Sequence, residues 1–238
     1  ADAWNQLGMS LEMTGRYEDA AAAYRQAIEK TPELAGEFGL LLGSVLLRME
    51  RFDEAEKHAK LGEKTNFGGS HVLLARIQLA RKHFAEAERE AHIAEGDKFS
   101  QVTARVLLAQ VYAQQDRAKE AYVITEEVAA EAEQRKLGNI ESLDFVRGDA
   151  LARMARYPEA IDALRREIEH FPHNRQAYAS LYLVYMLTNR PDDANGLLEL
   201  MVRVNPNKRA ALFAAHTVEA IGDQRGAAMW RQRAATLR

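Results

Sequence analysis

The sequence predicts an all-α fold made of about seven helical hairpins, and three observations lead to this prediction. The chain has 238 residues, which is about seven times a period of about 34 residues. A short segment that ends in alanine recurs along the chain, with successive alanines 35, 32, 34, 39, 34 and 33 residues apart. Residues that favour turns and helix ends stand at regular places between these copies. The recurring alanines are Ala20, Ala55, Ala87, Ala121, Ala160, Ala194 and Ala227.

A second position, twelve residues before each of these alanines, also holds a small residue in most copies. Two antiparallel helices pack about 8–10 Å apart when small side chains face each other and larger ones surround them. Each copy is therefore predicted to hold two helices, with one of the two small positions on each. The residues at the second position are Gly8, Gly43, Ala75, Ala109, Gly148, Tyr182 and Ala215.

Each unit is read in order as a first helix, a short turn, a second helix and a connection. Turn residues between the two helices are Gly15, Asp116, Asn189 and Gly222. Because proline cannot continue a helix, several second helices should end before a proline. These prolines are Pro32, Pro172 and Pro206. The units cover residues 1–35, 36–67, 68–101, 102–140, 141–174, 175–207 and 208–238.

Two units depart from the pattern. The fourth is 39 residues long, and its extra residues fall in the helix-favouring stretch 127–136. We expect a second helix about one turn longer, closed by Gly138 as a left-handed C-cap, and a change of superhelical geometry near residue 138. In the sixth unit Tyr182 occupies the small position. The alanines of the next first helix should face this tyrosine and keep the layer filled; they are Ala211, Ala214 and Ala215.

The first copy resembles a complete tetratricopeptide repeat (TPR), and the same pattern covers essentially the whole chain. The resemblance implies one array over residues 1–238, a right-handed superhelical α-solenoid in which the first helix of every pair lines a concave groove. Such arrays gain stability mainly from contacts between neighbouring repeats. The residues that carry the resemblance in the first copy are Trp4, Leu7, Gly8, Tyr17, Ala20, Tyr24, Ala27 and Pro32.

Composition and motifs exclude several classes of function. The absence of cysteine excludes disulfides, thiolate metal sites and a cysteine nucleophile, but leaves both the cytoplasm and the periplasm open. A net charge of −3 disfavours nucleic-acid binding, and no apolar run is long enough to span a bilayer. His170 and His173 flank a proline and gain no further ligand, so no metal or cofactor is predicted. No motif for catalysis occurs, and the chain is predicted not to be an enzyme.

Two other motifs are expected to be structural. Gly148 places the tripeptide Arg147-Gly148-Asp149 inside a helix, where it cannot act as an exposed adhesion loop. The aromatic stripe of the sixth unit has the spacing of a buried helix face, so core packing is preferred over a ligand shelf. This stripe consists of Tyr178, Tyr182, Tyr185 and Met186.

Binding is expected in the groove that the resemblance implies. A TPR groove is lined by about positions 2, 5, 9, 12 and 13 of each first helix, and these positions give a mixed polar surface with several arginines. Arginines and amides suit an extended peptide, since they pair with its carboxylates and bind its backbone. The clamp with which chaperone-binding members hold a terminal carboxylate is not reproduced. The predicted groove residues are Asn5, Met9, Glu37, Ser44, Arg48, Arg76, Gln110, Gln114, Asp149, Arg153, Gln176, Leu183, Arg209 and His216.

The favoured function is a scaffold that binds a protein or peptide segment in its groove. A competing hypothesis is a non-catalytic arm, for dimerisation or substrate presentation, of a larger bacterial hydrolase of the sulfatase-like or phosphatase-like type. The stretch from Arg147 to Ala160 is similar to TPR tails that follow such domains. The first hairpin, whose upstream face is uncovered, favours a partner from the same parent protein or a second copy. The alanine-rich repeats are typical of bacterial proteins.

Overall fold

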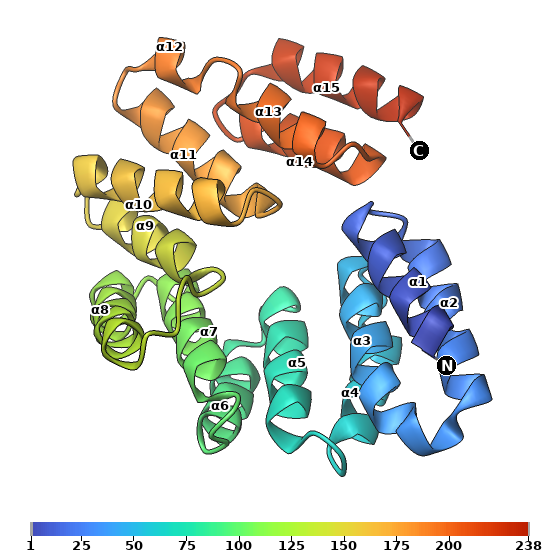
Figure 1. The fold of residues 1–238 in the computed structure, drawn as a ribbon. Coiled ribbons are helices and arrows are strands. Elements are labelled where there is room, and N and C mark those ends of the chain that lie inside the picture. Colours follow the sequence, from blue (N-terminus) through green and yellow to red (C-terminus); the bar gives the residue numbers. More distant parts are fainter. Residues whose placement is uncertain (1, 238) are drawn as a thin grey trace. The chain divides into compact units, whose positions relative to one another are not determined.

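The computed structural model describes residues 2–237, and these residues form helices joined by turns, with no strand among them. Figure 1 shows the helices in chain order. The predicted fold class, an all-α solenoid of about seven helix-turn-helix units, is confirmed. The first helices of the hairpins are α1 (Asp2–Met13), α3 (Ala35–Arg48), α5 (Phe67–Ala80), α7 (Gln101–Gln114), α9 (Leu143–Arg153), α11 (Arg175–Leu187) and α14 (Lys208–Glu219). The second helices are α2 (Tyr17–Lys30), α4 (Phe52–Gly62), α6 (Phe84–Glu95), α8 (Ala118–Arg135), α10 (Tyr157–His170), α12 with α13 (Pro191–Ala194 and Leu197–Val204) and α15 (Gln224–Thr236).

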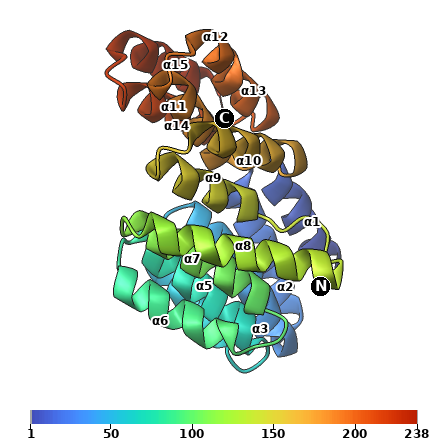
Figure 2. The same ribbon diagram turned by 90° about the vertical axis from the view of Figure 1, so that its left-hand side faces the viewer.

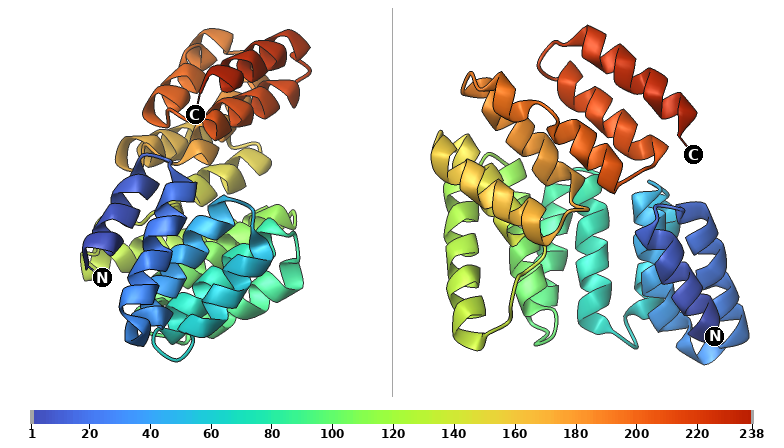
Figure 3. Two further views of the ribbon diagram at one scale, coloured as in Figure 1. Left: turned by 90° about the vertical axis from the view of Figure 1, so that its right-hand side faces the viewer. Right: turned by 45° about the horizontal axis from the view of Figure 1, so that its top comes forward.

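The chain forms two compact units, which meet in sequence in the turn between α7 and α8. The N-terminal unit ends at Gln115 and the C-terminal unit begins at Asp116. Each has its own apolar core. Figures 2 and 3 show from further directions how consecutive hairpins stack within each unit. The single array and the change of geometry near residue 138 stay predictions.

Every turn inside a hairpin uses a residue in the left-handed backbone region, placed two residues before the second helix begins. The four turn residues predicted from the sequence are among them. Three others could not be recognised by residue type, because glutamate, lysine and alanine rarely adopt a positive φ. The φ angles are 74° at Gly15, 61° at Glu50 and Lys82, 59° at Asp116, 58° at Ala155, 55° at Asn189 and 84° at Gly222.

The small positions bring the two helices of a hairpin close together, as predicted. A Cβ atom added to Gly148 on α9 would lie 2.6 Å from Cγ of Leu164 on α10. A Cβ atom added to Gly8 on α1 would lie 2.6 Å from the ring of Tyr24 on α2. Because real Cβ atoms do not approach so closely, glycine is needed at both positions.

The second helix of the fourth unit is longer, as predicted, but it ends differently. Helix α8 has 18 residues, four more than α2 or α10. Its left-handed C-cap is Lys136, with φ 54°, and the amide of Leu137 donates a hydrogen bond to the carbonyl of Ala132. Gly138 also has a positive φ, 74°, but lies in the connection. The prediction of Gly138 as the cap was wrong, because the helix closes two residues earlier at a lysine.

The second helix of the sixth unit is broken, which the repeat did not predict. Asn195 is extended and Gly196 is left-handed, with φ 79°, so these two residues separate α12 from α13. The break lies next to Tyr182, the large residue at the small position. Tyr182 packs partly against the alanines of α14, but an open cavity of about 430 Å³ remains beside it. Ala211, Ala214 and Ala215 are fully buried in the cluster against which Tyr182 packs, as expected, and none of them lines the cavity.

Candidate functional site

The first helices of neighbouring hairpins lie closer together than the second helices. In the N-terminal unit α3 contacts α5 and α5 contacts α7, and in the C-terminal unit α9 contacts α11 and α11 contacts α14. No comparable contact joins the second helices of neighbouring hairpins within the described residues. Closer spacing on one side curves each stack toward that side. Within each unit, the face formed by the first helices is thus the inner one.

All fourteen predicted groove residues lie on first helices, and none is buried. The most exposed are Met9, Glu37, Arg48, Arg76, Gln114, Arg153, Gln176 and His216. Asn5, Ser44, Gln110, Asp149, Leu183 and Arg209 are partly covered. This placement fits a binding role, but no bound group tests it, and the groove assignment stays a prediction.

In the N-terminal unit Arg48 takes part in a polar cluster between the first two hairpins. Its Nε lies 3.3 Å from Oε1 of Glu12 on α1, and its guanidinium lies 6.0 Å from the ring centroid of Tyr17. The hydroxyl of Tyr24 donates to the other carboxylate oxygen of Glu12 at 3.3 Å. Burial, and then the Glu12 charge, raise the pKa of Tyr24 well above its ordinary value. Arg48 is thus held against the groove face.

In the C-terminal unit Arg153 joins two carboxylates. Its Nε donates to Asp149, one turn earlier on α9, at 2.9 Å, and its Nη1 donates to Asp116 at 3.1 Å. Asp149 and Arg153 are the predicted groove residues that the structure pairs with each other. His216 lies near Glu219 on its own helix, with 3.6 Å between Nδ1 and Oε2. Several groove charges therefore have partners before any ligand arrives.

Apolar side chains on the first helices were missed by the sequence analysis. Met13 and Leu187 occupy the same register position as Arg48 and Arg153, and their exposed fractions are 77% and 69%. The repeat register itself was the signal that could have found them. They add apolar contacts at the carboxyl ends of α1 and α11, next to the predicted polar positions.

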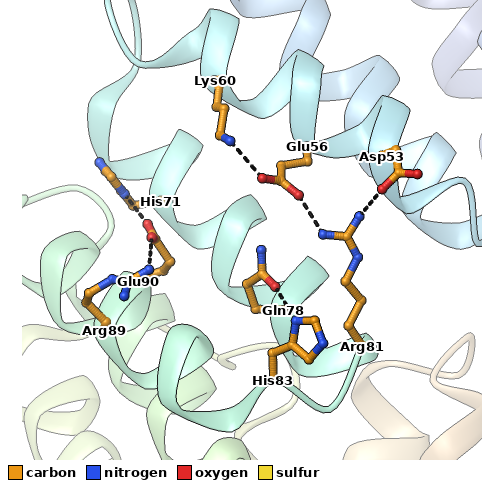
Figure 4. Close-up of polar contacts among 9 residues, drawn as sticks. All are labelled: Asp53, Glu56, Lys60, His71, Gln78, Arg81, His83, Arg89 and Glu90. Carbon is orange, nitrogen blue, oxygen red and sulfur yellow. Dashed lines mark hydrogen bonds and ion pairs between the residues drawn. The ribbon is translucent and has the colours of Figure 1, made fainter.

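A second group of charges links α4 of the second hairpin to the turn that follows α5 in the third (Figure 4). Arg81 donates to Glu56 at 2.5 Å and also binds Asp53, both on α4. Lys60 donates to the other oxygen of Glu56 at 2.7 Å. The hydrogen bonds from Lys60 and Arg81 lower the pKa of Glu56. His71 on α5 lies 2.6 Å from Glu90 on α6 in the same region. These contacts hold neighbouring helices together.

The remaining motifs behave as helix residues. Arg147-Gly148-Asp149 lies inside α9, with Gly148 buried and Arg147 paired with Glu126. Tyr178 and Tyr185 of the aromatic stripe are buried, with exposed fractions of 1% and 2%, while Tyr182 and Met186 line the cavity beside the helix break. Within residues 2–237 no group of three or more histidine, aspartate or glutamate side chains is placed to hold a metal ion. None of the helices described here is both long and apolar enough to cross a bilayer.

Comparison with known proteins finds matches to models of one repeat family. Two tetratricopeptide-repeat family models match the chain, one at residues 1–34 and the other at residues 145–208. No curated protein sequence matches it.

Solved TPR structures share the fold at low sequence identity. A TPR protein from Parabacteroides merdae is 13% identical, with a TM-score of 0.59, and the match covers all of this chain and 94% of that one. A thermophilic TPR protein from Thermus thermophilus is 16% identical, with a TM-score of 0.65 and coverage of 78% and 98%. Human IFIT1, solved as a dimer with m7Gppp-AAAA, is 16% identical, with a TM-score of 0.68. The match covers 92% of this chain and 55% of the IFIT1 chain. The two matched segments, residues 1–34 and 145–208, are therefore tetratricopeptide repeats, and the shared fold supports a tetratricopeptide-repeat protein over the rest of the described chain.

Proposed function

We propose that the protein is a protein-binding scaffold that holds an extended peptide segment against the inner face of its first helices. TPR proteins are interaction scaffolds in general, and that coarse function follows from the family. The observation that carries the finer proposal is that all fourteen predicted groove residues lie on first helices and remain accessible. They offer arginine, amide and apolar groups on one face, the combination that suits a peptide backbone with acidic and apolar side chains.

A protein ligand is favoured over RNA by charge. The IFIT1 structure contains a capped RNA, so a related fold accommodates nucleic acid. In the present chain Arg48 and Arg153 already pair with Glu12, Asp116 and Asp149, and the whole chain has a net charge of −3. RNA binding needs an excess of positive charge to replace the counterions of the phosphates. The chain as a whole lacks that excess, and two of the four groove arginines, Arg48 and Arg153, are already paired with carboxylates.

The proposal is tested by capture of partners from a lysate of the source organism. The wild-type chain is compared with an Arg76→Glu, Arg153→Glu variant, which reverses two charges on first helices. Lys57→Glu with Lys119→Glu is the matched control, because it makes the same charge change at exposed positions of the second helices α4 and α8. Circular dichroism checks that all three chains are folded.

The expected result is one protein that is captured by the wild type and the control and lost with the first-helix variant. Nuclease treatment before capture should leave this protein bound. Equal capture by all three chains would contradict binding at the inner face, and loss of capture after nuclease treatment would favour RNA.

The alternative role, a non-catalytic arm of a larger hydrolase, stays a prediction. Its support is the apolar surface of α1, where Trp4, Leu7 and Met13 have exposed fractions of 39%, 43% and 77%. A domain of the same parent protein that covered this surface would bury Trp4. In that case the tryptophan fluorescence of the parent protein should be shifted to the blue relative to this chain, and the Trp4→Phe variant should lose the shift.

A further inference from the structure

The cavity beside the helix break is a feature of the sixth hairpin. In the other hairpins the second helix is continuous, whereas here Asn195 and Gly196 separate α12 from α13. A tyrosine at the small position prevents the close approach that glycine or alanine allows elsewhere. The volume of about 430 Å³ lies within the range of about 300–1,000 Å³ that is typical of ligand pockets.

The cavity lies away from the groove. It opens between the second helices α12, α13 and α15 and the carboxyl-terminal halves of α11 and α14. None of the predicted groove residues lines it. Its occupant would therefore bind independently of a peptide on the inner face.

Apolar side chains form much of the cavity wall, and the charged side chains that line the cavity are all carboxylates. Apolar contacts come from Met186, Leu198, Met229 and Trp230, and Met229 is 56% exposed. The carboxylates are Asp192, Glu199 and Asp223, and no lysine, arginine or histidine lines the cavity.

Two arginines near the cavity, Arg190 and Arg233, are already engaged. Arg233 binds Glu199 and lies 5.1 Å from the ring centroid of Trp230. Arg190 binds Asp193, which does not line the cavity, at 2.7 Å. The charge of Asp223 also reaches the cavity wall, since it adds to burial in raising the pKa of Tyr182. A net negative rim is left at Asp192 and Asp223.

We propose that this cavity is a second docking site, which takes a large apolar side chain of a partner peptide with lysine or arginine on either side of it. The apolar side chain enters between Met186 and Trp230, where flexible methionine side chains adapt to its shape. The flanking cations face Asp192 and Asp223. An apolar segment with acidic neighbours meets repulsion at the same rim and is rejected.

The test uses the whole chain with ¹³C-labelled methionine methyl groups and the probe peptide acetyl-Ser-Lys-Phe-Lys-Ser-amide. The chain has seven methionines, of which Met186 and Met229 line the cavity. Met9 reports on the predicted groove and Met49 on the core of the N-terminal unit. We expect saturable shifts of the Met186 and Met229 signals, with the Met9 and Met49 signals unchanged. Replacing the phenylalanine of the peptide by alanine should abolish the shifts.

Variants separate the charge contribution from the apolar one. Asp192→Asn with Asp223→Asn removes both charges, and asparagine keeps the N-cap bond that Asp223 accepts from Gly226 at 2.8 Å. This variant should bind the probe about fivefold more weakly. Met229→Lys should bind more weakly still. Ala228→Lys, one residue away on the exposed side of α15, is the matched control and should bind like the wild type.

Three results would overturn the proposal. These are no shift of Met186 or Met229 with the phenylalanine peptide, equal shifts with the alanine peptide, and equal weakening by Ala228→Lys and Met229→Lys. Shifts confined to Met9 are a case of the first result and would place the peptide in the groove, so the proposed function is judged separately.

Discussion

At the scale of single residues, the left-handed turn positions carry local strain that the fold tolerates. Alanine is the least suited of the seven, since it has a Cβ atom and no polar group to form a local hydrogen bond. A non-glycine residue in this backbone region lowers the stability of the folded state by about 1–2 kcal/mol. Glycine lowers it by about 0.5–1 kcal/mol, because the unfolded chain gains conformational freedom at glycine. The balance favours glycine.

We therefore expect Ala155→Gly to raise the free energy of unfolding by about 0.5–1 kcal/mol, measured by urea denaturation. Ala152→Gly, in the last turn of α9, is the matched control and should lower it by up to about 1 kcal/mol, because glycine is a weaker helix former than alanine. A loss of stability with Ala155→Gly would show that the turn is not strained.

Glu167 is a buried residue whose carboxylate binds residues at the amino ends of two helices, α9 and α11. It accepts hydrogen bonds from the amides of Ser142 and Phe145 and from the side chain of Asn174, at 3.0, 3.2 and 2.7 Å. Burial raises the pKa of Glu167 above its ordinary value of 4.5 despite these bonds. Since the folded state holds this proton more tightly than the unfolded state, the carboxyl contributes most to stability below about pH 4.5.

The stability of the wild type relative to Glu167→Gln should consequently decrease as the pH rises above 4.5 and level off above the raised pKa. Urea denaturation of both chains between about pH 4 and about pH 8 measures this difference, since the range begins near the ordinary carboxyl pKa. Glu56→Gln provides the opposite case. The pKa of Glu56 is lowered, so its contribution is present at neutral pH and is lost as the pH falls. A flat difference for Glu167 would contradict the shifted pKa.

At the scale of helices, the register of small residues decides which positions can change. Ala87 on α6 is fully buried, while Ala85 on the same helix is exposed. We expect Ala87→Leu to lower the free energy of unfolding by about 1–3 kcal/mol through overpacking, and Ala85→Leu to leave it within about 0.5 kcal/mol. Thermal denaturation followed by circular dichroism distinguishes the two. Equal melting temperatures would show that the register is misplaced.

Much of the helix order was predictable, because turn residues and prolines mark the helix ends and because small residues recur where the two helices of each hairpin meet. The prolines at 32, 172 and 206 follow the ends of α2, α10 and α13 as expected. The turns at Glu50, Lys82 and Ala155 were not recognisable, since only their place in the repeat and not their residue type marks them. The break at Asn195-Gly196 did have a signal, because this dipeptide favours turns, but the repeat pattern predicted a continuous helix over it.

The candidate sites were less predictable than the helices. The register predicted which residues lie on first helices, and all fourteen are found there. It could not predict that Arg153 would be shared by Asp149 and Asp116, because the latter comes from a turn that lies 37 residues earlier. The cavity depends on the volume left around Tyr182, and that volume follows from packing between five helices.

At the scale of the whole molecule, the two units should respond separately to local damage. Met201 is fully buried in the core of the C-terminal unit. Met201→Ala should remove about 2–5 kcal/mol of stability. In repeat proteins such losses act mainly on neighbouring hairpins. We expect faster amide hydrogen exchange in α11–α15 and nearly unchanged exchange in α1–α4, measured by mass spectrometry. Uniform acceleration over the chain would contradict two separate units.

The turns within hairpins are nearly constant in length, with three residues between the helices in six hairpins and four in the last. The connections between hairpins vary from three to seven residues, and the longest is 136–142. We therefore expect inserted sequence to be tolerated better between hairpins than within them. Each hairpin can be treated as an exchangeable cassette whose junctions are the connections. A protease site or an affinity tag placed within 136–142 would leave both of its neighbouring cassettes intact.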